Sequence, residues 1–388
     1  MRDDPRTDLT EAFGGGGEIR VAAAPGRVNL IGEHIDYHGL AVLPMALRRR
    51  IRVAYRPRTD GLIRAVSAGY GRREFQWTPE LAPTAAGDWE NYARAAAQAV
   101  GRKWGAGAGM DAAVASDLPA AAGLSSSSAL LVALALALMD VNGRRARFEE
   151  LMEILPEGEQ FVGTHGGGMD HAASLASQEG CASLIAFDPL SARAIRMPRE
   201  WGFLVAHCLR TAEKSGRVRE AYNARRAAGT AALARLGYAS YREALAARAD
   251  GRLLPSSAER DAFLHVTGEA RRVAAAVKAM EAGDAAAFGS LLLASHASLR
   301  DGLKVSCPEL DRLVDAAMQS GAWGARLTGA GFGGCAVVFA ARRDLPSVRE
   351  GLMARFYGKR ADQEVRPTNH SAIVDADPGP GALYMGNS

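Results

Sequence analysis

The sequence predicts an α+β protein built from two domains, and three observations support this. The chain has 388 residues, which is more than one compact domain usually holds. Its first half mixes short alternating stretches with helical patterns, whereas the segment from about residue 215 to 320 is mostly helical. Strand and helix patterns do not alternate regularly, so we expect separate sheets and helical layers rather than repeated βαβ units.

Residue periodicity gives the elements of the first half. A flexible GGGG lead-in at residues 14–17 precedes them. Helical spacing predicts a helix over residues 88–104, with Asp88 as its N-cap, and an Ala- and Leu-rich helix from about residue 124 to 141. Alternating apolar residues bounded by turn signals predict strands at residues 18–24, 51–57, 62–68, 73–77 and 110–116.

The second half begins with two further strands, expected at residues 181–187 and 202–208. The helical segment after them should break near Gly237, Pro255, Gly283 and Pro308. A last strand is expected at residues 335–341, after a glycine-rich stretch. We place the domain boundary between an N-terminal domain of residues 1–205 and a C-terminal domain of residues 206–388.

Composition and charge exclude several functional classes. The 47 basic and 43 acidic residues give a net charge of +4 and are scattered, which argues against nucleic acid or membrane partners. The longest apolar run, residues 129–139, is too short to span a bilayer. The polar N-terminus does not resemble a secretory signal. Four cysteines without CxxC spacing suit a reducing compartment, so we expect a cytoplasmic protein.

A phosphate loop (residues 120–127) is the clearest local indication of chemistry. A small-residue loop follows Pro119 and runs into the helix expected from residue 124. Amide groups at a helix start have no partner within the helix, and together with the helix dipole they attract anions. Serine hydroxyls there suit phosphate oxygens or a bridging Mg²⁺ ion. The alternative is a buried helix that is merely capped by serine. The pattern is not a Walker A motif.

Two other glycine-rich stretches have weaker local meaning. GTHGGGMDH (residues 163–171) places Asp170 behind a glycine loop, which suits close approach to a ligand but is also typical of an ordinary turn. The third glycine motif, TGAGFGG (residues 328–334), runs from a loop into a strand. That order is the reverse of a dinucleotide-binding fingerprint, so we reject a Rossmann fold.

The stretch APGRVNLIGEHIDYHG (residues 24–39) concentrates hydrogen-bonding side chains behind a short apolar strand. His34 and His38, four residues apart with Asp36 between them, invite interpretation as a metal site. In a loop or strand this spacing does not put both imidazoles on one face, and no further ligand set accompanies them. We therefore exclude zinc.

Together, the three motifs resemble those of the GHMP small-molecule kinases, a family that includes galactokinase, homoserine kinase and mevalonate kinase. GRVNLIGEHIDYHG is similar to the signature of the galactokinase branch. Other segments that resemble this branch are WENYARAAA (89–97), AYNARR (221–226) and SHASLRDGLKVSCPELDRLV (295–314). The resemblance covers nearly the whole chain. It implies a two-domain GHMP-kinase fold with the active site in the cleft between the domains.

The resemblance implies catalytic and sugar-binding roles for matching residues. Asp170 matches the proposed base that takes the proton of the anomeric hydroxyl. Arg27 matches the arginine that keeps this carboxylate ionised and stabilises the developing charge. Residues that match the sugar contacts are Glu33, His34, Asp36 and Tyr222.

It also implies nucleotide and metal contacts. The predicted nucleotide-binding residues are Gly123, Leu124, Ser125, Ser126 and Ser127. A Mg²⁺ ion bound with ATP would contact Ser126 or Ser127, and we assign it to Ser127 and Glu159. The residues of the third glycine motif that would close the site are Gly329, Gly331, Gly333 and Gly334.

Departures from the family pattern lie mainly on the nucleotide and metal side. Ala121 replaces a glycine of the phosphate loop. Gly158 stands where the family has its magnesium-binding glutamate, and a shift of one residue would let Glu159 serve instead. His171 and Gly166 replace a glutamine and a cysteine beside the catalytic aspartate.

The sequence thus predicts an ATP-dependent, Mg²⁺-requiring sugar 1-kinase, with galactose as the first substrate to test. We expect a monomer that binds ATP and a monosaccharide. Ile35, His38 and Leu40 replace the commoner Thr, Asn and Gly, so the rim of the sugar pocket is expected to differ. A kinase for another sugar, such as N-acetylgalactosamine or arabinose, is therefore one alternative. A non-catalytic sugar and ATP sensor is another.

Overall fold

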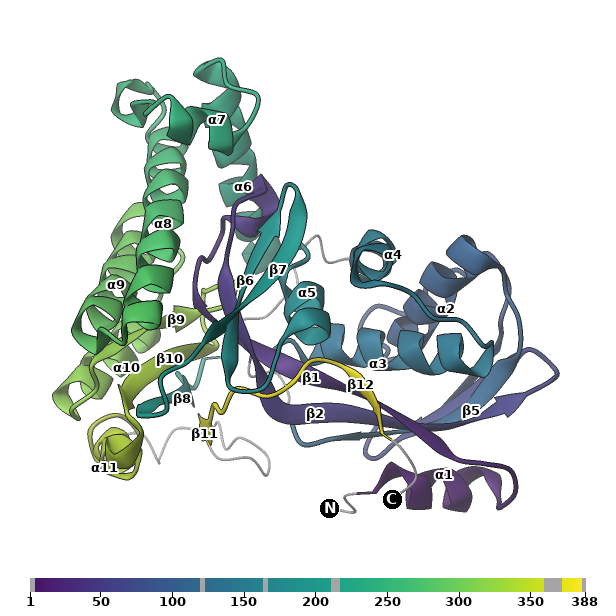
Figure 1. Cartoon of the computed structure of the whole chain (residues 1–388). Helices are drawn as coiled ribbons and strands as arrows, with labels where there is room; N and C mark the ends of the chain where they lie inside the picture. Colours follow the sequence, from purple (N-terminus) through teal and green to yellow (C-terminus); the bar gives the residue numbers. More distant parts are fainter. Residues whose placement is uncertain (1–3, 119–122, 163–166, 211–216, 359–371, 386–388) are drawn as a thin grey trace.

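The computed structural model describes residues 4–118, 123–162, 167–210, 217–358 and 372–385. Its N-terminal domain is built on a six-stranded sheet with the order β12-β1-β2-β5-β3-β4 (Figure 1). Its strands are β1 (Arg20–Ile31), β2 (Leu43–Arg58), β3 (Leu62–Ser67), β4 (Gly71–Gln76), β5 (Gly109–Ser116) and β12 (Leu383–Met385). Strands β3 and β5 are parallel and the other pairs are antiparallel, so the sheet is mixed, in agreement with the predicted α+β class.

Four helices lie over one face of this sheet (Figure 1). They are α2 (Glu90–Trp104), α3 (Ser126–Val141), α4 (Phe148–Phe161) and α5 (Met169–Ala176). Because side chains alternate along a strand, every second residue, such as Ala22, Val53 and Ala112, joins the core beneath α3. Helix α3 is buried along most of its length, as its apolar sequence predicts.

The opposite face of the sheet is covered by α1 (Pro5–Phe13), which the sequence analysis did not predict. Leu9 of α1 packs against the alternate strand residues Val21, Ala54 and Ala113 in a small separate cluster. The helix has few apolar residues, so its periodicity is weak. Its start carries two recognisable signals, however, because Asp4 caps the helix and Pro5 follows at its first position.

The C-terminal domain has a four-stranded sheet of order β11-β8-β10-β9 beside a group of helices (Figure 1). The strands are β8 (Trp201–His207), β9 (Gly324–Thr328), β10 (Cys335–Ala341) and β11 (Ile373–Asp375). The helices are α6 (Arg217–Arg235), α7 (Tyr241–Ala246), α8 (Ser257–Ala282), α9 (Ala285–Ala297), α10 (Pro308–Gln319) and α11 (Leu345–Leu352). A hairpin of β6 (Cys181–Phe187) and β7 (Leu190–Arg196) connects the two domains along the chain.

The four predicted helix breaks are confirmed. Gly237 follows the end of α6, and Pro255 precedes α8. Gly283 ends α8 in the left-handed conformation that a helix C-cap favours. Pro308 is the first residue of α10, where its missing N–H costs no helical hydrogen bond.

Other predictions differ from the structure in extent. The first strand continues from residue 24 to Ile31, so the apolar part of the 24–39 stretch belongs to the sheet. The second strand is 16 residues long and therefore much longer than the predicted 51–57. The predicted boundary after residue 205 falls inside β8, whose partner β10 belongs to the C-terminal sheet. We therefore propose a boundary before Trp201.

The N-cap residue of α2 is Trp89 rather than the predicted Asp88, but the Asp88 carboxylate accepts a hydrogen bond from the Glu90 N–H at 2.9 Å and so binds the same end of the helix. Across the residues that the structure describes, we find no helix both long and apolar enough to cross a membrane.

Candidate active site

An ion pair between Arg27 of β1 and Asp170 of α5 lies at the centre of the candidate site. Arg27 Nε donates to Asp170 Oδ1 at 2.7 Å, and Nη2 lies 2.6 Å from the same oxygen. The Arg27 side chain is buried, whereas a quarter of the Asp170 side chain is exposed. The two residues are 143 positions apart and meet because α5 packs on β1. The structure thus brings together the two residues that we predict to be catalytic.

The start of α3 lies directly beside this pair. Ser125 Oγ donates to Asp170 Oδ2 at 2.6 Å. Ser125 is the residue before the helix, and its side chain makes no capping hydrogen bond. The structure therefore does not support the alternative of a serine-capped helix. The positive end of the α3 dipole, with the amides that begin at Ser126, remains suited to an anion.

Arg27 also fixes the end of the phosphate loop. Its backbone N–H donates to the Leu124 carbonyl at 3.0 Å, and Nη1 donates to the Gly123 carbonyl at 2.9 Å. A Cβ on Gly26 would lie 2.7 Å from the Leu124 oxygen, so this close approach of strand and loop requires glycine. Ala121 lies outside the described residues.

Glu33 is buried among residues of the C-terminal domain. Its carboxylate accepts a hydrogen bond from the Gly329 N–H at 2.6 Å, and Arg326 Nη2 lies 3.0 Å away. It also accepts a short hydrogen bond from Asn29 and a bond from Thr328 Oγ1 at 3.3 Å. The carboxylate therefore joins the end of β1 to the third glycine motif. Its predicted contact with the sugar stays a prediction.

His34 makes the same connection through its ring. Its Nε2 lies 3.1 Å from the Ala330 carbonyl oxygen, which only accepts, so this nitrogen carries the proton. Nδ1 then accepts from the Tyr37 hydroxyl at 2.8 Å. Burial lowers the pKa of His34 to about 3, so the ring is neutral at pH 7.

Asp36 lies near Asp170 in the same site. Burial raises the pKa of Asp36 to about 6, and the negative charge of Asp170 acts in the same direction. The glycine loop before α5 closes around it, because a Cβ on Gly167 would overlap the Asp36 carboxylate and lie 2.6 Å from the Tyr37 nitrogen. The close backbone approach expected for this glycine stretch is present at Gly167, whereas Gly166 lies outside the described residues.

Tyr222 reaches the site from α6. Its ring centroid lies 5.1 Å from that of His34 and 5.6 Å from that of Tyr37. Burial raises the pKa of Tyr222, and the charges of Asp36 and Asp170 add to this effect. All four predicted sugar-binding residues therefore gather around the Arg27–Asp170 pair.

The third glycine motif faces the phosphate loop across the two domains. A Cβ on Gly329 would lie 3.9 Å from the Gly123 carbonyl oxygen. Gly334 N–H donates to the Arg210 carbonyl at 2.8 Å, which anchors the far end of the motif. The predicted glycines all have positive φ angles, namely Gly329, Gly331, Gly333 and Gly334. Glycine is favoured at such positions because side chains strain this conformation.

On the metal side, the structure distinguishes Gly158 from Glu159. A Cβ on Gly158 would point at Leu131 of α3, so a glutamate at this position would face the helix core. Glu159 is buried and accepts a short hydrogen bond from Ser128 Oγ, and its Oε1 lies 3.9 Å from His171 Nε2. The one-residue shift is therefore compatible with the geometry, and the serine that donates to Glu159 is Ser128, one residue beyond the predicted Ser127.

The three residues of the expected rim change take packed positions. Ile35 and Leu40 are buried in the main hydrophobic core. His38 packs against α6 and α7. The expected difference at the rim of the sugar pocket stays a prediction.

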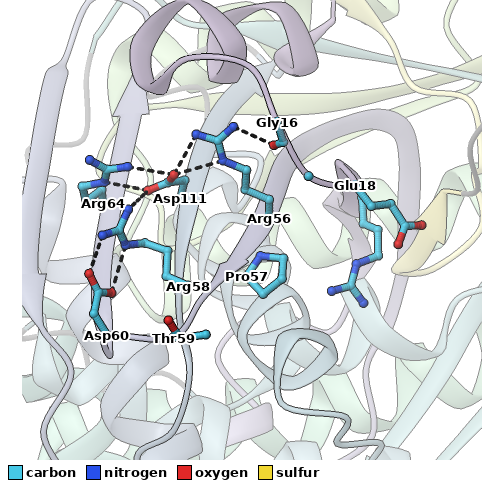
Figure 2. Close-up of a pocket in the computed structure, with 11 residues that line it drawn as sticks. Gly16, Glu18, Arg56, Pro57, Arg58, Thr59, Asp60, Arg64 and Asp111 are labelled. Atoms are coloured by element: carbon cyan, nitrogen blue, oxygen red, sulfur yellow. Dashed lines mark hydrogen bonds and ion pairs between the residues drawn. The ribbon is translucent and has the colours of Figure 1, made fainter.

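A cavity of about 460 Å³ lies elsewhere, between the segment after α1 and strands β2, β3 and β5 (Figure 2). Arg56, Arg58 and Arg64 all donate to the buried Asp111 in its wall. Arg56 also donates to carbonyl groups of residues 13–16. The cluster fastens the N-terminal segment to the sheet, so we assign it a structural role.

Sequence reasoning missed the buried charges that support the site. Arg326 of β9 donates to the Leu30 carbonyl at 2.9 Å besides facing Glu33. Glu269 of α8 accepts from the Gly32 N–H at 3.0 Å, and His265 Nε2 lies 3.0 Å from the Glu33 carbonyl oxygen. The lone arginine within the apolar GARLTG stretch could have indicated this network, because a buried charge needs a partner.

Comparison with known proteins places this geometry among sugar kinases. The galactokinase galactose-binding signature matches residues 8–57, and the GHMP kinase N-terminal and C-terminal domains match residues 91–178 and 276–358. A galactokinase of Roseiflexus sp. (strain RS-1) is 38% identical over 349 residues, which cover 87% of each chain. The Homo sapiens galactokinase is 36% identical over 372 residues, which cover 92% of each. The structure of Lactococcus lactis galactokinase complexed with galactose superposes with a TM-score of 0.87 at 27% identity, covering 98% of each chain.

Proposed function

The chain belongs to the galactokinase family, and we propose that Asp170 and Arg27 are the residues on which its phosphoryl transfer depends. It is an ATP-dependent galactose kinase, a phosphotransferase that acts on a sugar hydroxyl group. The observation that carries the proposal is the placement of the Arg27–Asp170 ion pair beside the uncapped start of α3.

In the proposed step, the anomeric hydroxyl of galactose attacks the γ-phosphorus of ATP. The new O–P bond forms as the bond to the ADP oxygen breaks, and the hydroxyl proton passes to the Asp170 carboxylate. Arg27 holds that carboxylate ionised and in place before the transfer. The products are galactose 1-phosphate and ADP.

We assign the sugar hydroxyls to Asp36 and Tyr222, together with Glu33 and His34. A carboxylate accepts and a phenol also donates, so Asp36 and Tyr222 suit a ligand with several directed hydroxyls. Both ring nitrogens of His34 already pair with Tyr37 and Ala330, so His34 would exchange one of these partners for the sugar. Glu33 and His34 already hold the third glycine motif, so sugar binding on this side would be coupled to the position of that motif.

The start of α3 and the residues Ser125, Ser126 and Ser127 would receive the phosphate groups. Among the residues described, no group of three or more His, Cys, Asp or Glu side chains is placed to hold a metal. This fits Mg²⁺, which commonly takes one or two protein oxygens besides phosphates and water. Ser127 and Glu159 are the donors that we propose, and Mg²⁺ would neutralise charge on the γ-phosphate.

The comparisons do not favour a kinase for N-acetylgalactosamine or arabinose, or a non-catalytic sensor. We further propose a cytoplasmic monomer. All four cysteines are free and buried, which suits a reducing compartment that supplies ATP.

The experiment is a coupled ADP-release assay with galactose, glucose, N-acetylgalactosamine, talose and arabinose. We expect the highest kcat/KM on galactose, and about a 10³-fold loss of kcat in Asp170→Asn, which keeps the shape but removes the base. Asp375→Asn is the matched control, because Asp375 pairs with Arg349 on the surface at 2.7 Å. Equal rates in Asp170→Asn and wild type would show that Asp170 is not the base.

A further inference from the structure

Five aromatic rings join the sugar side of the site to the helices of the C-terminal domain. They begin at the short helix η1 (Asp36–His38), which carries Asp36. Tyr37 packs on His38 with ring centroids 4.7 Å apart, and His38 packs on Tyr241 of α7 at 4.8 Å. We call this the ring cluster, and its members are His34, Tyr37, His38, Tyr222 and Tyr241.

His38 fills a notch on α6 at Gly229. A Cβ on Gly229 would lie 2.8 Å from His38 Cε1 and still closer to Nε2, so any side chain there would overlap the ring. The notch has a fixed wall, because the Tyr241 hydroxyl donates to the Gly229 carbonyl at 2.7 Å. The imidazole thus occupies the space that a side chain at position 229 would need.

Packing, rather than a hydrogen bond to Nε2, holds this edge of the His38 ring in place. In the described part of the chain, His38 Nε2 is buried without a hydrogen-bond partner. Burial lowers the pKa of His38 to about 4, and the positive charge of Arg226 contributes. The ring is therefore neutral at pH 7 and acts as a packing group between η1, α6 and α7.

The notch lies on the same helix as Tyr222, about two turns further along α6. On the other side of the contact, His38 shares its helical turn with Asp36. Seating the ring in the notch therefore sets the distance between Tyr222 and Asp36. A shift of α6 relative to η1 would move one wall of the sugar pocket and leave the phosphate loop unchanged.

We propose that His38, seated in the notch at Gly229, is a positioning residue that holds Tyr222 over the bound galactose. This inference rests on the proposed function, since it assumes that Tyr222 and Asp36 bind the sugar. It assigns a role in galactose affinity to a residue that the sequence distinguishes from its family.

The test is a double-mutant cycle of His38→Ala and Gly229→Ala, measured by KM for galactose, KM for ATP and calorimetric galactose binding. Each single variant should raise the galactose KM and Kd about tenfold, because displaced binding groups lose alignment, with KM for ATP unchanged. In the double variant, the methyl group at 229 enters space left by the imidazole. Gly229→Ala should then cause little further loss in the His38→Ala background.

Gly15→Ala is the control. Gly15 lies in the segment after α1, away from the ring cluster, and a Cβ there would meet no atom within 4 Å. This variant should bind galactose like the wild type, and thermal melts show whether each variant folds. Three outcomes would overturn the proposal. The two substitutions could have independent, multiplicative effects in the cycle. The KM values for galactose and ATP could change equally, or the galactose KM could stay unchanged in the single variants. Wild-type protein that fails to phosphorylate galactose would instead contradict the proposed function.

Discussion

Two clusters of arginine and aspartate in the N-terminal domain contain the same chemical groups in different surroundings. Asp170 pairs with Arg27 between two glycine loops and a helix start, and a quarter of its side chain is exposed. Asp111 accepts hydrogen bonds from three arginines, and only 3% of its side chain is exposed. The residue types alone do not distinguish a reactive carboxylate from a structural one. The exposure of the carboxylate and the backbone around it make this distinction.

The largest expected effect is on kcat, and it distinguishes the Arg27–Asp170 pair from the Asp111 cluster. Arg27→Met should lower kcat about 10²–10³-fold, because it removes a fixed positive charge from the reacting carboxylate. The melting temperature should also fall, because Arg27 is buried and bonds the Gly123 carbonyl as well, so kcat is measured on the folded variant. Arg20→Met is the control, since Arg20 lies on the same strand but pairs with Asp140 away from the site. Equal losses of kcat in both variants would remove the distinction.

The second effect separates the clusters by stability. Asp111→Asn should lower the free energy of unfolding by about 3 kcal/mol, because three arginines lose their buried partner. Urea unfolding measures this, and kcat of the folded variant should stay near wild type. Asp60→Asn, in the same cavity but half exposed, should cost much less, because solvent screens its ion pair with Arg58. A large loss of kcat in Asp111→Asn would contradict a purely structural role.

The smallest effect uses pH to distinguish the aspartates. Asp36 has a pKa raised to about 6, mainly by burial, so acid removes its charge first. We expect the galactose KM to rise as pH falls through 6, approaching about tenfold per pH unit, because protonated Asp36 no longer accepts a sugar hydroxyl in the same way. KM for ATP over the same range is the control. A galactose KM that stays constant from pH 8 to 5 would contradict this assignment.

Protonation of Asp36 and protonation of Asp111 change the free energy of unfolding in opposite directions. The pKa of Asp36 is higher in the folded protein, so its contribution to the free energy of unfolding increases as pH falls from about 6 towards 4. Burial alone would raise the pKa of Asp111, but hydrogen bonds from Arg64 and Arg56 lower it. The stability from Asp111 is therefore lost as pH falls below the usual aspartate range. Urea unfolding of wild type and Asp111→Asn between pH 3 and 7 compares the two directions.

Much of the fold follows from local sequence signals. Each break in the helical half coincides with a proline or glycine whose backbone preference acts within a few residues, as at Gly283 and Pro308. The ion pair of Arg27 with Asp170 was also predictable, because both residues belong to recognisable motifs. Helix α1 was not, since it is short and mostly polar and depends on packing against the sheet.

The supporting contacts of the site depend on tertiary structure and could not be predicted in this way. The partners of Glu33 include Arg326 and Gly329, nearly 300 residues away, and no local spacing specifies such a meeting. The proposed use of Glu159 as a metal ligand in place of position 158 depends on the rotation of α4 against α3. Only the packed position of Gly158 against Leu131 reveals that rotation.

Strand β12 has a consequence for how the protein folds during translation. It follows both domains in the chain, yet it pairs with Val21, Ala22 and Ala23 of β1 in the N-terminal sheet. The ribosome therefore makes most of the first sheet long before the strand that covers its edge. Until β12 emerges, β1 offers unpaired backbone groups to other chains. The nascent protein is thus most exposed to misassembly while its C-terminal domain is being synthesised.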